Sequence, residues 1–101
     1  AEELQPLKAR VVEMVKLYEQ ALEYVKEAQD QEVQDFLARR LYNMTGDIVM
    51  SLLILEDATR SAELFSKSAN VYVRMAQAEV TAEHVYIMNF VKEDLPSFRA
   101  E

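Results

Sequence analysis

Leu41-Tyr-Asn-Met-Thr-Gly-Asp-Ile-Val-Met-Ser-Leu-Leu-Ile-Leu55 is the stretch that decides the fold, and it contains the only glycine of the 101-residue chain, Gly46. With one glycine and two prolines, the chain has little material for tight turns, so we expect it to be nearly all helical. A glycine inside a helix costs about 1 kcal/mol relative to alanine. Its presence therefore predicts that another backbone packs close to Gly46.

Apolar residues recur at helical spacing over three long segments, which predict helices at about 3–28, 32–58 and 61–91, followed by a tail at 92–101. Helices of nearly thirty residues are about 40 Å long at 1.5 Å per residue. Short turns between such helices force neighbours to run antiparallel. The predicted fold is all-α, an up-down-up antiparallel bundle of three long helices, or of four if one of them is broken.

The second predicted helix carries two apolar stripes, and the third carries one broad stripe. We expect the two stripes of the second helix to lie side by side on its surface. Together they form a wide apolar arc, which is typical of a helix packed against two neighbours. The main stripe of the second helix is Leu37, Leu41, Met44, Ile48, Leu52 and Leu55, and its second stripe is Tyr42, Val49 and Leu53. The expected buried side of the third helix is Leu64, Phe65, Ala69, Tyr72, Met75, Ala76, Val80, Ile87 and Phe90.

Composition restricts the possible partners and the compartment. The formal net charge is −7 and no basic patch is visible, which argues against nucleic acid and anionic membranes as partners. The longest apolar run, at 52–55, is four residues long and far too short to span a bilayer. The chain has no cysteine, which fits a reducing compartment, and we expect the cytoplasm.

A polar strip on the second helix provides the main candidate network. Arg40, Asn43 and Asp47 share one face and are spaced to reach Glu79 and Glu83 on the third helix. Two carboxylates four residues apart inside a bundle could bind metal. Carboxylate-bridged metal bundles need Glu-x-x-His motifs, however, and here Thr81 lies three residues before His84. We therefore predict a structural network, with no catalytic, cofactor-binding or metal-binding residue on this chain.

The second helix is apolar nearly all round, which suggests a docking surface for another domain or subunit. The alternative is apolar surface scattered without function. The candidate docking face comprises Phe36, Met50 and Ile54 on the second helix, Leu17 and Tyr24 on the first helix, and Phe98 in the tail.

Several stretches resemble the extreme C-terminal region of large bacterial acyl-CoA dehydrogenases, which carry extra helices after the catalytic body. The resemblance is strongest between Phe36 and Leu95 and weakest in the first helix. The stretches are Leu41-Tyr-Asn-Met-Thr-Gly-Asp-Ile-Val-Met-Ser-Leu-Leu-Ile-Leu-Glu-Asp-Ala-Thr59, Phe65-Ser-Lys-Ser-Ala69, Ala76-Gln-Ala-Glu-Val80 and Asn89-Phe-Val-Lys-Glu-Asp-Leu95.

The resemblance implies a parent enzyme that uses FAD to oxidise an acyl-CoA thioester to the enoyl-CoA. None of the family's catalytic or FAD-binding motifs matches this sequence, so the resemblance assigns no catalytic or cofactor residue here. The chain starts without methionine, and Leu4 already belongs to a helical repeat, so we expect a fragment of a longer protein. We expect it to serve docking, assembly or coverage of the acyl chain, with the rest of the enzyme or another subunit as partner. A freestanding helical protein that binds partners or associates with itself, as a homo-oligomer, is the alternative.

Overall fold

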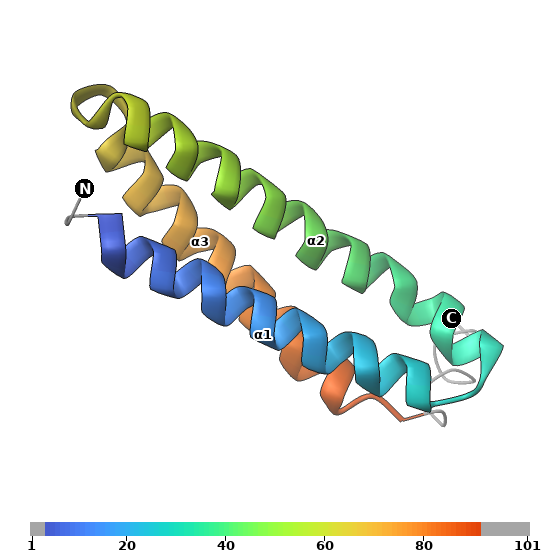
Figure 1. Ribbon diagram of the computed structural model, residues 1–101. Coiled ribbons are helices and arrows are strands. Elements are labelled where there is room, and N and C mark those ends of the chain that lie inside the picture. The colour runs from blue at the N-terminus through green and yellow to red at the C-terminus, as the bar shows by residue number, and fades with distance from the viewer. Residues whose placement is uncertain (1–3, 92–101) are drawn as a thin grey trace.

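The computed structural model describes residues 4–91, which form an antiparallel up-down-up bundle of three helices (Figure 1). Helix α1 runs Gln5–Glu27, α2 runs Gln31–Arg60 and α3 runs Ala62–Met88. The predicted all-α fold is confirmed, and none of the three helices is broken. Helix α3 ends at Met88 rather than at 91, and the tail at 92–101 lies outside the described residues. No described helix is long and apolar enough to cross a membrane.

Short turns fix the antiparallel order. Gln29 turns the chain after α1 with a positive φ of 49°. Asp30 then caps α2, because its carboxylate accepts hydrogen bonds from the backbone N–H groups of Glu32 and Val33 at 3.0 and 3.2 Å. Ser61 alone separates α2 from α3, and its carbonyl accepts the N–H of Phe65. Turns this short leave the helices no arrangement other than side by side.

All three helices contribute to one apolar core. Helix α1 presents the stripe expected from its spacing, and Met14 and Ala21 in its middle are fully buried. Helices α2 and α3 close the core with residues at three- and four-residue spacing. The buried apolar residues of the two are Val33, Leu37, Met44, Ile48, Leu55 and Ala58 on α2, and Ala69, Val73, Ala76, Val80 and Ile87 on α3.

The second stripe of α2 does not lie where the spacing predicted. Tyr42, Val49 and Leu53 are 78%, 47% and 51% exposed. At 3.6 residues per turn each residue advances about 100° around the helix, which places these three opposite the buried stripe rather than beside it. The prediction that they pack against a second neighbour within this chain is therefore wrong for the residues described.

Two smaller errors have the same origin. Leu52 of the expected main stripe is 51% exposed, and Ser51 is buried in its place. On α3, Leu64, Phe65 and Met75 were expected in the core and are 73%, 37% and 49% exposed. On both helices the bundle covers a narrower arc than the spacing predicted.

Gly46 also lies in the open. A Cβ atom added at this position would meet nothing within 4 Å, so no backbone of the described chain packs against it. The prediction of a close neighbour is wrong for the bundle by itself. Within this chain Gly46 only weakens α2.

Replacing Gly46 with alanine should therefore stabilise the dilute chain by about 0.5–1 kcal/mol, the difference in helix propensity. Urea unfolding followed by far-ultraviolet circular dichroism measures the change. The reciprocal variant Ala78→Gly, at an exposed position of α3, should lose a similar amount. A loss of stability in the Gly46→Ala chain would mean that another part of the protein packs on this site.

Candidate functional site

An open groove of about 560 Å³ runs between α2 and α3 on the side away from α1. It contains most of the polar residues singled out in the sequence. The lining residues are Tyr42, Asn43, Gly46, Asp47 and Met50 from α2, and Tyr72, Glu79, Ala82 and Glu83 from α3.

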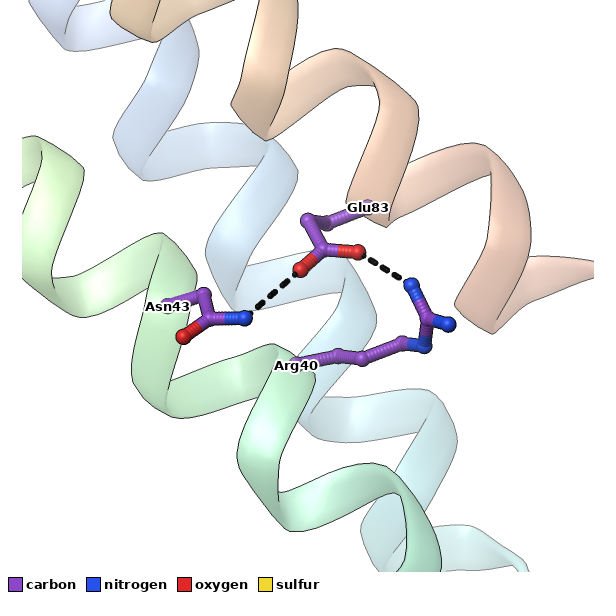
Figure 2. Close-up of polar contacts among 3 residues, drawn as sticks. All are labelled: Arg40, Asn43 and Glu83. Carbon is purple, nitrogen blue, oxygen red and sulfur yellow. Dashed lines mark hydrogen bonds and ion pairs between the residues drawn. The ribbon is translucent and has the colours of Figure 1, made fainter.

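Glu83 joins the two helices at one end of the groove. Its two carboxylate oxygens accept hydrogen bonds from Arg40 at 2.7 Å and from Asn43 at 3.2 Å (Figure 2). The Glu83 side chain is only 14% exposed and that of Arg40 is 38% exposed. A partly buried, charge-assisted pair of this kind fixes the register of α2 against α3 more firmly than a solvated surface pair.

Asp47 lies one turn along α2 from Asn43 and faces Glu79. Burial, the charge of Glu79 and a hydrogen bond with its side chain raise the pKa of Asp47 from 3.8 to about 6, with a further contribution from Glu83. Burial, and then the charges of Asp47 and Glu79, also raise the pKa of the Tyr72 hydroxyl above 10.0. The groove is therefore an anionic site in which Asp47 loses its proton at a higher pH than a free aspartate does.

An aromatic cluster closes the other side of Arg40. The guanidinium lies over the Tyr86 ring, with 3.7 Å between its central carbon and the ring centroid, a cation–π arrangement. Tyr86 contacts Phe90, and Phe90 stacks on Phe36 with the two centroids 5.2 Å apart. Arg40 is thus held from both sides, by a carboxylate and by an aromatic ring.

The structure brings together the five residues of the predicted polar network. Arg40, Asn43 and Glu83 are in direct contact, and Asp47 interacts with Glu79. Sequence reasoning missed Tyr86, which it had not placed beside the network. A signal existed, because Tyr86 follows Glu83 by three positions and Glu79 by seven, and so lies on the same face of α3.

The candidate docking residues are distributed differently. Leu17, Tyr24, Phe36 and Ile54 are partly buried and pack on the core. The Tyr24 hydroxyl also donates a hydrogen bond to the backbone carbonyl of Phe90 at 3.0 Å. Met50 is 51% exposed at the groove, and Phe98 lies outside the described residues. The residues of this set in 4–91 therefore do not form one continuous exposed surface.

A metal site is not found in the described part of the chain. No three His, Cys, Asp or Glu side chains among residues 4–91 come together so as to hold an ion. His84 lies on the α1 side of α3, where one ring nitrogen is 2.9 Å from the side-chain oxygen of Gln20. It is therefore separated from the carboxylates of the groove.

The groove does not suit FAD either. Its charged lining consists of the carboxyl groups of Asp47, Glu79 and Glu83, which would repel the two negative charges of a pyrophosphate. The nearby cation, Arg40, is already paired with Glu83 at 2.7 Å. We assign no cofactor-binding role to these residues.

The raised pKa of Asp47 makes stability depend on pH. Because the folded-state pKa of this acid lies above its unfolded value, the folded chain holds the proton more tightly. The resulting stabilisation is complete below pH 3.8 and is lost as the pH rises through about 6. Replacing Asp47 with asparagine should therefore raise the free energy of unfolding at pH 7 by about 1 kcal/mol or less, after allowance for solvent screening.

Urea unfolding at pH 4 and pH 7 measures this effect, and the difference between the variant and the parent should shrink toward zero at pH 4. Asp57→Asn, at an exposed position on the same helix, is the matched control. It should change the free energy of unfolding by the same small amount at both pH values. An Asp47→Asn chain that is less stable than the parent at pH 7 would contradict the electrostatic repulsion inferred between Asp47 and Glu79.

Comparison with known proteins identifies the family. Residues 1–95 match the family model described as acyl-CoA dehydrogenase C terminal. The crystal structure of an acyl-CoA dehydrogenase family protein from Porphyromonas gingivalis is 37% identical over 90% of this chain and 78% of the solved chain, with a TM-score of 0.83. No curated protein matches significantly. The resemblance noted in the sequence is confirmed, and the chain belongs to the acyl-CoA dehydrogenase C-terminal family.

Proposed function

We propose that this chain is the non-catalytic C-terminal helical domain of an FAD-dependent acyl-CoA dehydrogenase and serves in docking and assembly. The parent enzyme would oxidise an acyl-CoA thioester to the enoyl-CoA on a catalytic body that lies elsewhere in the polypeptide. The family assignment supports the link to such an enzyme. The role of the domain is argued below from how its polar and apolar side chains are used.

The polar residues of the groove are engaged with each other. Arg40 and Asn43 bind Glu83, and Asp47 interacts with Glu79. A catalytic carboxylate needs access to the reacting atom of a substrate, whereas Glu83 is held by two donors from α2. These groups therefore favour a structural role in joining the helices.

The apolar surface supports docking, and this is the observation that carries the proposal. Leu64 and Val71 on the outside of α3 are 73% and 66% exposed, and Val85 further along is 53% exposed. The α3 outer face, defined as Leu64, Val71, Met75, Ala78, Ala82 and Val85, is exposed throughout. It extends about 30 Å along the helix at 1.5 Å per residue, and an apolar stripe this long is typical of an interaction surface.

A domain in the same polypeptide as its partner needs only a modest interface. Covalent connection sets a high effective concentration of the two partners, so few apolar contacts suffice to keep them together. We therefore place the contact with the rest of the dehydrogenase on the α3 outer face. Met50, across the groove and 51% exposed, is the one residue of the original candidate set within 4–91 that lies exposed beside it.

The intact mass and the visible absorption spectrum of the natural gene product test the parent enzyme. We expect a mass several times 11.7 kDa together with flavin absorption bands. A colourless product close to 11.7 kDa would overturn the proposal and favour a freestanding self-associating protein.

Substituting Leu64 and Val71 together with aspartate tests the docking face in the full-length gene product. The isolated chain should keep its helical circular dichroism, because both side chains are mostly exposed. In the full-length protein we expect limited proteolysis to release the helical domain several-fold faster. Val12→Asp on α1, at a 55% exposed position, is the control and should leave the cleavage rate unchanged. Equal rates for all three proteins would contradict docking through this face.

A further inference from the structure

The outer side of α2 carries a second regular pattern that the bundle does not use. Eight positions follow one another at alternating spacings of four and three residues, the heptad spacing of a coiled-coil seam. All eight are exposed, and by helical spacing they lie opposite the buried stripe of α2. The α2 outer stripe consists of Asp35, Arg39, Tyr42, Gly46, Val49, Leu53, Glu56 and Arg60.

Along the α2 outer stripe the order of charged and uncharged positions is the same from both ends, and the sign of the charges is reversed between the two ends. The apolar positions and Gly46 occupy the middle, and each end carries one acidic and one basic residue. When two copies of such a helix pair antiparallel about a centre between positions 47 and 48, alternate seam positions meet in layers. Tyr42 then faces Leu53 of the second copy, and Gly46 faces Val49.

We propose that two copies of this chain associate through the α2 outer stripe as an antiparallel α2–α2 pair with two-fold symmetry. The inference rests on the assembly role proposed above and names the partner as a second copy of the chain. An isologous contact of this kind is the commonest form of closed oligomer. The α3 outer face remains available for the body of the parent enzyme.

Charge complementarity selects both the partner and the orientation. In the antiparallel pair Arg39 meets Glu56 of the second copy, and Asp35 meets Arg60, so both terminal layers join opposite charges. A parallel pair in register would place each of these charges against its own copy, which disfavours that arrangement. The four charged residues of the stripe sum to zero, whereas the whole chain carries −7. The stripe therefore lacks the repulsion expected between two acidic proteins.

Charged residues at both ends of the α2 outer stripe already form side-chain contacts within one chain. Arg60 donates to Glu56 at 2.7 Å, and Gln31 donates to Asp35 at 2.8 Å. A second copy would extend these contacts into clusters of alternating charge at both ends of the seam. Polar groups at seam positions of this kind fix register and orientation at some expense of stability.

Gly46 gains a role in this arrangement. Nothing in the described chain lies within 4 Å of an added Cβ, so the glycine serves no packing purpose in the bundle alone. In the pair, the two Gly46–Val49 layers are adjacent at the centre, and the missing side chain lets the two α2 backbones approach closely. The helix propensity lost at Gly46 is then offset by the interface.

Sedimentation equilibrium of the 101-residue chain tests the association. We expect a concentration-dependent mass approaching twice 11.7 kDa. Leu53→Asp should abolish the dimer, because it places aspartate opposite Tyr42 in two symmetry-related layers. The control Val12→Asp, 55% exposed on α1, should leave the dimer intact. A parent chain that stays monomeric at ~100 μM would overturn the proposal, because its Kd would then be weaker than a specific pair requires.

A charge exchange between chains tests the terminal layers. Arg39→Glu alone and Glu56→Arg alone should each weaken the dimer at least tenfold, because each places like charges in two layers. An equimolar mixture of the two variants should recover association as a heterodimer in which every layer is complementary again. Failure of the mixture to associate better than either variant would contradict the assigned layers.

Cysteine cross-linking tests the antiparallel register, and the chain offers no competing cysteine. Under oxidation, a mixture of Tyr42→Cys and Leu53→Cys chains should give a disulfide-linked heterodimer. Tyr42→Cys alone should not cross-link, because the two copies of that position are about 16 Å apart along the pair at 1.5 Å per residue, beyond disulfide reach. The opposite pattern would show a parallel pair and overturn the proposal.

These measurements test the α2 pair independently of the proposed parent enzyme. A dimer with the expected register in a colourless product of 11.7 kDa would support the α2 pair and reject the dehydrogenase parent. A large flavin-containing product whose isolated C-terminal chain stays monomeric would do the reverse.

Discussion

Three helices around one core can bury only one side of each helix, because both neighbours of any helix lie on the same side of it. The rest of this structure follows from that constraint. Helix α2 has a buried stripe running from Val33 to Ala58 and an opposite stripe that is half apolar and exposed at every position. The bundle satisfies the first stripe by itself. The second stripe is left uncovered by residues 4–91.

The polar contacts between α2 and α3 hold the buried stripes of these two helices against each other. Glu83, 14% exposed and held by Arg40 and Asn43, sets the register in which the core side chains meet. The Arg40 guanidinium is also held by the Tyr86 ring, so it has little freedom to bind anything else. Opposed carboxyl groups at Asp47 and Glu79 weaken the same interface at neutral pH. In the groove, the Arg40–Glu83 pair stabilises the contact between α2 and α3, and the Asp47–Glu79 pair weakens it. These contacts leave the apolar outer faces of both helices unused.

The sequence allowed the fold, the family and the composition of the polar network to be predicted, for physical reasons that particular residues make clear. Spacing at three and four residues identifies which side chains share a face, and so Arg40, Asn43 and Asp47 could be assigned together and opposite Glu83. Spacing alone does not say which face points inward. Tyr42, Val49 and Leu53 form as regular a stripe as Leu37, Met44 and Ile48, and only packing against α1 and α3 separated the two sets.

Gly46 illustrates the same limit. Its presence in a helix predicted close approach by another backbone, and no such backbone lies among residues 4–91. Spacing along a single chain identifies an exposed apolar stripe but does not say whether a partner covers it. The proposed partner rests on symmetry and charge along the α2 outer stripe, which experiment can test.

Oxidative footprinting of Tyr42 by mass spectrometry tests the central claim, that the outer side of α2 is covered in the assembled protein. Tyr42 is 78% exposed in the single chain, whereas Tyr86 lies beside Arg40 and should change little. On raising the concentration from dilute to associated protein, we expect the oxidation of Tyr42 to fall several-fold while that of Tyr86 stays constant. Association with unchanged oxidation of Tyr42 would contradict the account, because the contact would then lie on another face of the bundle.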